Sequence, residues 1–300
     1  MNVPAAAASV ARAYLCVVPA RFRIAPTPSG YLHLGNGVNF ALTAALAHAH
    51  DAELGLRIDD LDAARVREAY RADVGATLRW LFPGGLVGRL LRAPTRQSDR
   101  RDRYAYVLAG LRQNGLVFGC DCTRRELAAA RAGGGGDVNV YPGTCAGRAL
   151  DLDADGVAWR MRASGVVVRQ KDRGASYQLA SLTDDVDLGV THLVRGGDLR
   201  DSTALQRVLA QALTGVSGGG DWPDFGRFGR VRAWHHPLLT DAGGRKLSKS
   251  AGDSSLAAVR ARGGSAAGVF GAAGRLLGVA GLTDFAGLAA AARRVSIAWT

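Results

Sequence analysis

One short segment combines residue types that suit the binding of a nucleotide phosphate. Over residues 23–36, a short apolar strand is followed by a loop rich in proline and glycine and by a helical pattern that starts near His33. The first turn of a helix offers unpaired backbone N–H groups and the positive end of the helix dipole, which attract phosphate. Gly35 lets a nucleotide approach the backbone. A bare His-x-Gly is also typical of an ordinary strand–helix turn with a surface histidine, and on these residues alone that reading stays open.

A second segment, residues 243–250, carries Lys246 and Lys249 in a glycine-flanked loop. Only three of the 38 basic residues are lysine, the third being Lys171, so two of them lie in one pentapeptide. Lysine is a compact point charge and arginine a planar fork, which indicates that this loop needs ammonium groups. Such a loop can close over a triphosphate and offset charge between the α- and β-phosphates. The alternative is a solvated basic turn.

The cysteines indicate a metal site. Four cysteines in 300 residues are too few for a disulfide scaffold, which favours a reducing compartment, and three of them, Cys120, Cys122 and Cys145, fall in one short segment while Cys16 stands alone. Three thiolates and one further ligand complete a tetrahedral zinc site. Because Cys-x-Cys differs from the usual Cys-x-x-Cys knuckle, reduced cysteines without a metal remain an alternative.

The elements around these residues predict a parallel sheet. Strands are expected at 21–25 and 53–58, the second ending in an acidic cluster that begins with Asp59, and helices at 34–50 and 63–81. This β-α-β-α order is typical of α/β proteins. Residues 82–95 fit no periodic pattern and are predicted as loop.

Further along, a helix is expected at 99–114 with Ser98 as its cap, followed by antiparallel strands within 157–171. A helix and a returning strand are predicted over 177–193, a helix at 202–213, a strand at 230–239, and short helices in the last fifty residues. His192, His235 and His236 are interpreted as surface or core histidines.

Composition and charge narrow the class of protein. The chain is 48% hydrophobic with a formal net charge of +12, which favours a globular protein with a polyanionic partner such as nucleic acid or nucleotide. No run of about 18 apolar residues is present, so we expect no membrane association. Residues 1–20 lack the basic start of an export signal and carry Arg12, so we expect a cytoplasmic protein.

The two phosphate-binding segments occur in the order found in class I aminoacyl-tRNA synthetases. Residues 33–36, His-Leu-Gly-Asn, resemble the His-Ile-Gly-His signature, and residues 246–250, Lys-Leu-Ser-Lys-Ser, resemble the Lys-Met-Ser-Lys-Ser signature. Residues 23–33, 56–62, 176–180 and 194–199 resemble the glutamyl-tRNA synthetase catalytic core, so that the likeness runs from about residue 21 to residue 252. Cys-x-Cys with a later Tyr and Cys is similar to the zinc site of a family of short paralogues, the glutamyl-queuosine tRNA(Asp) synthetases.

The resemblance implies an α/β fold with a Rossmann-like parallel sheet, an inserted zinc-containing α+β subdomain and a short helical C-terminal segment. The expected boundaries are an N-terminal extension at 1–20, the first half of the catalytic domain at 21–98, the inserted subdomain at 99–175, the second half at 176–252, and the helical segment at 253–300. An anticodon-binding domain is not expected in the last fifty residues.

The implied activity is ATP-dependent formation of glutamyl-adenylate, followed by transfer of glutamate to the cyclopentenediol of queuosine at the wobble position of tRNA(Asp). The resemblance implies a monomer, one structural zinc ion and Mg²⁺ that enters with ATP. It assigns the zinc to Cys120, Cys122, Tyr141 and Cys145, catalysis to His33, Lys246 and Lys249, ATP binding to His33, Gly35, Asn36 and Lys249, and glutamate binding to Arg23, Ala25, Thr27, Asp59, Tyr177 and Arg195. Asp59 stands where the family commonly has Glu, one methylene longer.

Two alternative functions remain open. A truncated ligase of the same class would act on another acceptor, such as the 3′ end of tRNA or a carrier protein. A catalytically silent RNA-binding relative is the second, and the two lysines retained at 246 and 249 argue against it.

Overall fold

A parallel sheet forms the centre of the molecule in the computed structural model, which describes residues 19–134, 141–172, 174–239 and 255–300. Strand β1 (Arg21–Ile24) pairs with β2 (Glu53–Ile58), and β2 pairs with β3 (Thr95–Arg96). Strand β7 (His192–Gly196) pairs with β8 (Arg232–His236). Both groups are parallel, and the Thr191 N–H donates to the Arg21 carbonyl at 2.9 Å, so β7 lies beside β1. The predicted parallel α/β fold is confirmed.

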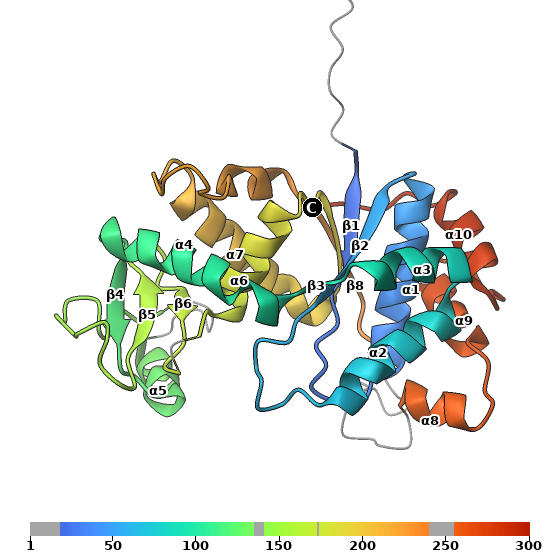
Figure 1. Cartoon of the computed structure of the whole chain (residues 1–300), viewed down its shortest axis with the longest axis horizontal. Helices are drawn as coiled ribbons and strands as arrows, with labels where there is room; N and C mark the ends of the chain where they lie inside the picture. Colours follow the sequence, from blue (N-terminus) through green and yellow to red (C-terminus); the bar gives the residue numbers. More distant parts are fainter. Residues whose placement is uncertain (1–18, 135–140, 173, 240–254) are drawn as a thin grey trace, which may run out of the picture.

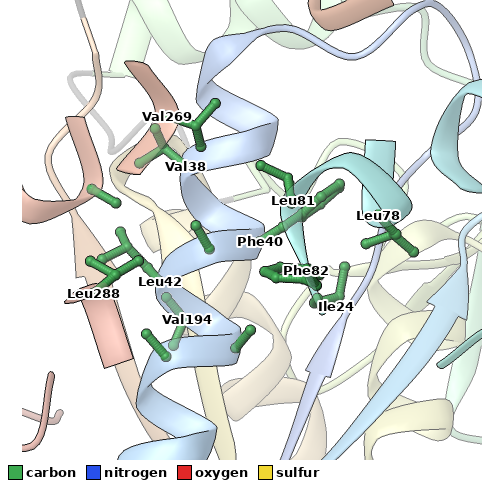
Figure 2. Packing of buried hydrophobic residues seen from close by; sticks show 14 of the residues in the cluster. Ile24, Val38, Phe40, Leu42, Leu78, Leu81, Phe82, Val194, Val269 and Leu288 are labelled. Atoms are coloured by element: carbon green, nitrogen blue, oxygen red, sulfur yellow. The ribbon is translucent and has the colours of Figure 1, made fainter. Parts of the chain in front are cut away.

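Helix α1 (Leu34–Ala49) is buried because helices cover it on the side away from the sheet. It packs on β1 and β7, and against α9 (Ala267–Leu276) and α10 (Phe285–Ala292). Figure 2 shows Val38 and Leu42 of α1 close to Val269 and Leu288 of these helices. The helices predicted at the C-terminal end therefore complete the hydrophobic core that α1 shares with β1, β2 and β7. With α8 (Leu256–Ala261) they confirm the expected short helical segment.

Two expectations beside β2 are corrected. Helix α2 (Glu68–Leu81) begins at Glu68, not near residue 63, because residues 63–65 form turns. Residues 84–92, predicted as loop, form helix α3 (Gly84–Arg92). Val87 and Leu90 lie three residues apart on its buried face and join the same core as α2, so tertiary packing outweighs the low helix propensity of its glycines.

A second, antiparallel sheet lies between the two parallel groups in sequence. It consists of β4 (Val117–Cys120), β5 (Ala158–Met161) and β6 (Val167–Arg169), in agreement with the strands predicted within 157–171. Helix α4 (Arg101–Gln113) precedes it and α5 (Arg124–Gly134) follows β4. The expected cap is wrong: Ser98 lies in the short 3-10 helix η1 (Gln97–Arg100), where its N–H donates to Asp60 Oδ1 at 2.8 Å.

The helices on the other side of the parallel sheet are α6 (Tyr177–Asp187) and α7 (Arg200–Leu213), with two short 3-10 helices, η2 (Gly197–Leu199) and η3 (Phe225–Arg230). They share a second hydrophobic core with α4, β5, β6 and β7. Figure 1 shows α4, α6 and α7 on the side of the sheet opposite to α1 and α2. Among the described residues, every helix is too short or too polar to cross a membrane.

Candidate active site

A cavity of about 240 Å³ opens where the parallel strands end at their carboxyl side. In α/β sheets of this kind, ligands bind outside the carboxyl ends of the strands. Nine of the predicted site residues line it together: Arg23, Ala25, Thr27, His33, Gly35, Asn36, Asp59, Tyr177 and Arg195. Lys246 and Lys249 lie outside the described residues. The structure thus brings together the nine described residues to which the resemblance assigns a role in binding glutamate or ATP.

The N-terminus of α1 forms one wall of this cavity. His33 precedes the helix, and its backbone N–H donates to Asn36 Oδ1 at 3.1 Å. A Cβ atom on Gly35 would lie only 2.9 Å from His33 Cε1, so the glycine leaves room for the imidazole. The first-turn N–H groups and this histidine can therefore meet a phosphate group.

Two arginines supply positive charge to the cavity. Arg23 at the end of β1 donates from Nε to Asp185 Oδ1 at 2.8 Å and from Nη2 to Asp185 Oδ2 at 3.0 Å. Arg195 on β7 donates from Nη1 to Thr203 and Gln206, while its buried Nε has no hydrogen-bond partner among the described residues. Burial lowers the pKa of Arg195. Asp185 is its charged partner, with Oδ2 at 3.5 Å from Nη2, and the Nε–H has no acceptor in the described part of the chain.

Asp59 is held by a residue that the sequence did not single out. Arg57 is completely buried and donates to Asp59 from Nε at 2.6 Å and from Nη2 at 3.0 Å. Burial raises the pKa of the Asp59 carboxyl, and the charge of Arg57 opposes that effect. The sequence does contain a signal for Arg57, because it is the one charged residue in the otherwise apolar strand segment Leu-Gly-Leu-Arg-Ile.

Behind the cavity, α6 contributes two adjacent buried carboxylates. Asp184 accepts hydrogen bonds from Gln97, Arg100 and Tyr104. Asp185 faces the strands instead. Burial alone would raise the pKa of Asp185, but the charges of Arg23 and Arg57 outweigh it and lower the pKa to about 2. Arg57 also pairs with Asp59, and Arg100 also pairs with Asp187, so these arginines and carboxylates form one network behind the cavity.

A larger cavity, of about 480 Å³, adjoins the first. The two share Thr27, Asp59 and Tyr177 as walls. The far wall comes from η1 and α4 and from the segment after β6, and includes Gln97, Arg101, Gln170 and Asp172. A second substrate in this space would reach a ligand in the first cavity past Tyr177.

The cysteines form a candidate metal centre beside the antiparallel sheet. The Sγ atoms of Cys120, Cys122 and Cys145 lie within 4.8 Å of one another. Tyr141 Oη lies 3.6 Å from Cys120 Sγ and accepts a hydrogen bond from the Cys145 N–H at 2.8 Å.

The donor set at this centre fits a metal ion that prefers sulfur ligands. Burial raises the pKa of the Cys120 thiol, but hydrogen bonds from Arg160 and Tyr141 outweigh it and lower the pKa to about 7. Burial raises the pKa of Tyr141. Burial also raises the pKa of the Cys122 thiol. The support for a metal ion is therefore the proximity of the three Sγ atoms, with the phenol placed beside them.

Two of the three histidines have core positions, as expected. His192 is buried and stacks on Phe22 with a ring-centroid distance of 4.7 Å. His236 is buried as well, but it also lines the smaller cavity and lies 3.2 Å from Asn39 Nδ2. The sequence did not indicate this position, because it depends on β8 lying next to β7.

Comparisons with known proteins agree with this geometry. Residues 19–158 match the family described as tRNA synthetases class I (E and Q), catalytic domain. The chain is 38% identical over 251 residues to a glutamyl-Q tRNA(Asp) synthetase of Parasynechococcus marenigrum, covering 80% of this chain and 77% of that relative. A glutamyl-Q tRNA(Asp) synthetase of Symbiobacterium thermophilum is 38% identical over 301 residues, covering 87% of both chains.

A solved structure shows the same arrangement of elements. A glutamate tRNA ligase from Elizabethkingia meningosepticum, in complex with its amino acid, superposes with a TM-score of 0.57 at 25% identity. The match covers 78% of this chain and 53% of that one, so this chain spans about half of that protein.

Proposed function

Because the chain belongs to the glutamyl-Q tRNA(Asp) synthetase family of class I ligases, we propose that it activates L-glutamate with ATP and transfers the glutamyl group to queuosine in the anticodon loop of tRNA(Asp). The observation that carries the proposal is Arg195, whose buried Nε lacks a hydrogen-bond partner among the described residues, at the wall of a cavity that also holds the N-terminus of α1. The same cavity therefore suits a carboxylate and a phosphate.

The first step is attack of a glutamate carboxylate oxygen on the α-phosphorus of ATP. The bond from this phosphorus to the oxygen that bridges to the β-phosphate breaks, and pyrophosphate leaves with Mg²⁺. Arg23 and Arg195 bind substrate carboxylates, because a guanidinium forms strong, charge-assisted hydrogen bonds with them. Asp59 binds the α-ammonium group and Tyr177 lines the pocket with Ala25 and Thr27. The protein therefore contributes position and charge, not a covalent nucleophile.

The phosphates of ATP occupy the wall formed by α1. His33, the backbone near Gly35, and Asn36 hold them at the positive end of the helix dipole. Lys249, with Lys246, stabilises the pyrophosphate as it departs.

The second step takes place between the two adjoining cavities. A hydroxyl oxygen of the queuosine cyclopentenediol attacks the activated carbonyl carbon, an ester forms, AMP leaves, and the hydroxyl proton is released. The larger cavity supports this proposal because it shares Thr27, Asp59 and Tyr177 with the glutamate site and is wide enough for a nucleoside. Exposed arginines hold the phosphates of the anticodon loop.

The cysteine centre binds one zinc ion through Cys120, Cys122 and Cys145, with Tyr141 as the fourth ligand. When bound, zinc supplies a structural crosslink that ties β4 to the segment around Cys145. The support is the proximity of the three Sγ atoms and the placement of the Tyr141 hydroxyl beside Cys120.

Pyrophosphate exchange tests the activation step. With glutamate and ATP but no tRNA, the protein should incorporate labelled pyrophosphate into ATP, and glutamine or aspartate should give far less. Absence of exchange with glutamate would favour the silent RNA-binding relative.

Transfer is tested with two forms of one tRNA. tRNA(Asp) that carries queuosine should accept radiolabelled glutamate, and the same tRNA with guanine at the wobble position should not. Equal labelling of both forms, or labelling that is lost when only the 3′ end is oxidised, would point to a truncated ligase for another acceptor.

A further inference from the structure

Asp185 contacts three arginines that come from three different strands of the parallel sheet. It lies on α6, is completely buried, and does not line the smaller cavity. Its carboxylate accepts two hydrogen bonds from Arg23 and one from Arg57 Nη1 at 2.9 Å. Arg195 Nη2 lies 3.5 Å from its Oδ2. One carboxylate thus joins β1, β2 and β7 behind the site.

These contacts restrict the arginines that face the substrate. An arginine side chain has several rotatable bonds, and its guanidinium can bind a carboxylate in two places only when its plane is held in the correct orientation. Asp185 holds Arg23 by two parallel hydrogen bonds, and of these two residues only Arg23 lines the smaller cavity. Asp185 also lies against one Nη of Arg195, a residue that lines the smaller cavity, while Thr203 and Gln206 hold the other Nη.

We propose that Asp185 is a positioning residue for the amino-acid substrate, which orients Arg23 and Arg195 toward its carboxylates without touching the substrate. The inference rests on the proposed function, because it assumes that these arginines bind glutamate. A misplaced binding group loses much of its effect on a bound reactant. Loss of Asp185 therefore weakens the binding of glutamate. The binding of ATP changes little, because the N-terminus of α1 holds its phosphates.

Asp184 provides a matched control. It is the adjacent residue on α6 and equally buried, but its hydrogen bonds go to Gln97, Arg100 and Tyr104. Of Arg23, Arg57 and Arg195, Asp184 contacts only Arg57, in an ion pair of 3.7 Å. Asp184→Asn and Asp185→Asn make the same chemical change in the same helix, and only the second removes the anchor of Arg23 and Arg195.

The experiment measures KM for glutamate, KM for ATP and kcat of pyrophosphate exchange, with melting temperatures of all proteins. Asp185→Asn should raise KM for glutamate at least tenfold and change KM for ATP by less than threefold. Asp184→Asn should lower the melting temperature to a similar extent and change KM for glutamate by less than threefold.

A rise of less than tenfold in folded Asp185→Asn, or an equal rise in Asp184→Asn, would overturn the proposal and leave Asp185 a role in stability alone. Should Asp185→Asn not fold, Asp185→Glu keeps the charge and moves the carboxylate by one methylene. It should also raise KM for glutamate at least tenfold, and an unchanged KM would refute the positioning role. Lack of exchange by the wild-type protein would instead refute the proposed function.

Discussion

Replacing Gly35 with alanine should impair catalysis without destabilising the protein. Gly35 is the second residue of α1, where alanine favours the helix over glycine by up to about 1 kcal/mol. The new Cβ would lie 2.9 Å from His33 Cε1 and 3.0 Å from His33 Nδ1. Optimal contacts between carbon atoms are about 3.5–4.0 Å, so the imidazole must move by roughly 0.5–1 Å.

That movement displaces a group proposed to hold phosphate. A misplacement of about 1 Å in a catalytic arrangement can cost on the order of a hundredfold in rate. We therefore expect Gly35→Ala to lower the rate of adenylate formation by about ten- to a hundredfold while the free energy of unfolding stays equal or rises. Pre-steady-state adenylate formation and urea denaturation measure the two effects.

Gly88→Ala is the matched control. Gly88 lies within α3, and a Cβ there would have no atom within 4 Å. It should raise the free energy of unfolding by up to about 1 kcal/mol and leave the rate unchanged. Full activity of Gly35→Ala would show that His33 tolerates the displacement, and a less stable Gly35→Ala would show that the steric cost outweighs helix propensity.

Three further predictions concern the metal, pH and the buried charges. Elemental analysis should find about one zinc ion per chain, lost in Cys122→Ser and kept in Cys16→Ser; zinc retained in both would exclude the cysteine centre. Burial lowers the pKa of His192 to about 4, so below its ordinary pKa of about 6.5 the unfolded chain takes up a proton that the folded chain does not. Stability, measured by urea denaturation, should therefore fall by up to about 3 kcal/mol as pH drops from about 6.5 to 4, and by less in His192→Phe; equal losses would refute this origin. Arg57→Met leaves buried carboxylates without their partner and should cost about 3–5 kcal/mol of unfolding free energy, whereas Arg65→Met, at an exposed pair, should cost below about 1 kcal/mol; similar losses would contradict the buried network.

Much of the site was predictable because its parts are local in sequence. His33, Gly35 and Asn36 occupy one turn of one helix, and Asp59 follows a strand directly. Strand ends of a parallel sheet share one edge, so the predicted β-α-β order already places these segments together. Cys120 and Cys122 are likewise two residues apart at the end of β4.

The buried charges were not predictable in the same way. Arg57 is 128 residues from Asp185, and their ion pair depends on α6 lying behind β1 and β2. The sequence around Asp184 and Asp185, Leu-Thr-Asp-Asp-Val-Asp, is equally consistent with an exposed acidic turn of a helix. Only packing shows that both carboxylates are enclosed.

By itself the sequence determined which segments are helix and strand wherever hydrophobic periodicity is strong. Its resemblance to a known family indicated which residues belong to the site at the strand ends. The tertiary structure decided the elements and contacts for which the local sequence pattern is weak. Val87 and Leu90 make α3 a helix only because the core that includes α2 covers them. Ser98 binds Asp60 rather than capping α4 because β3 pairs with β2 and brings η1 beside it. In each case a contact distant in sequence outweighs a weak local preference, and such contacts exist only once the chain has folded.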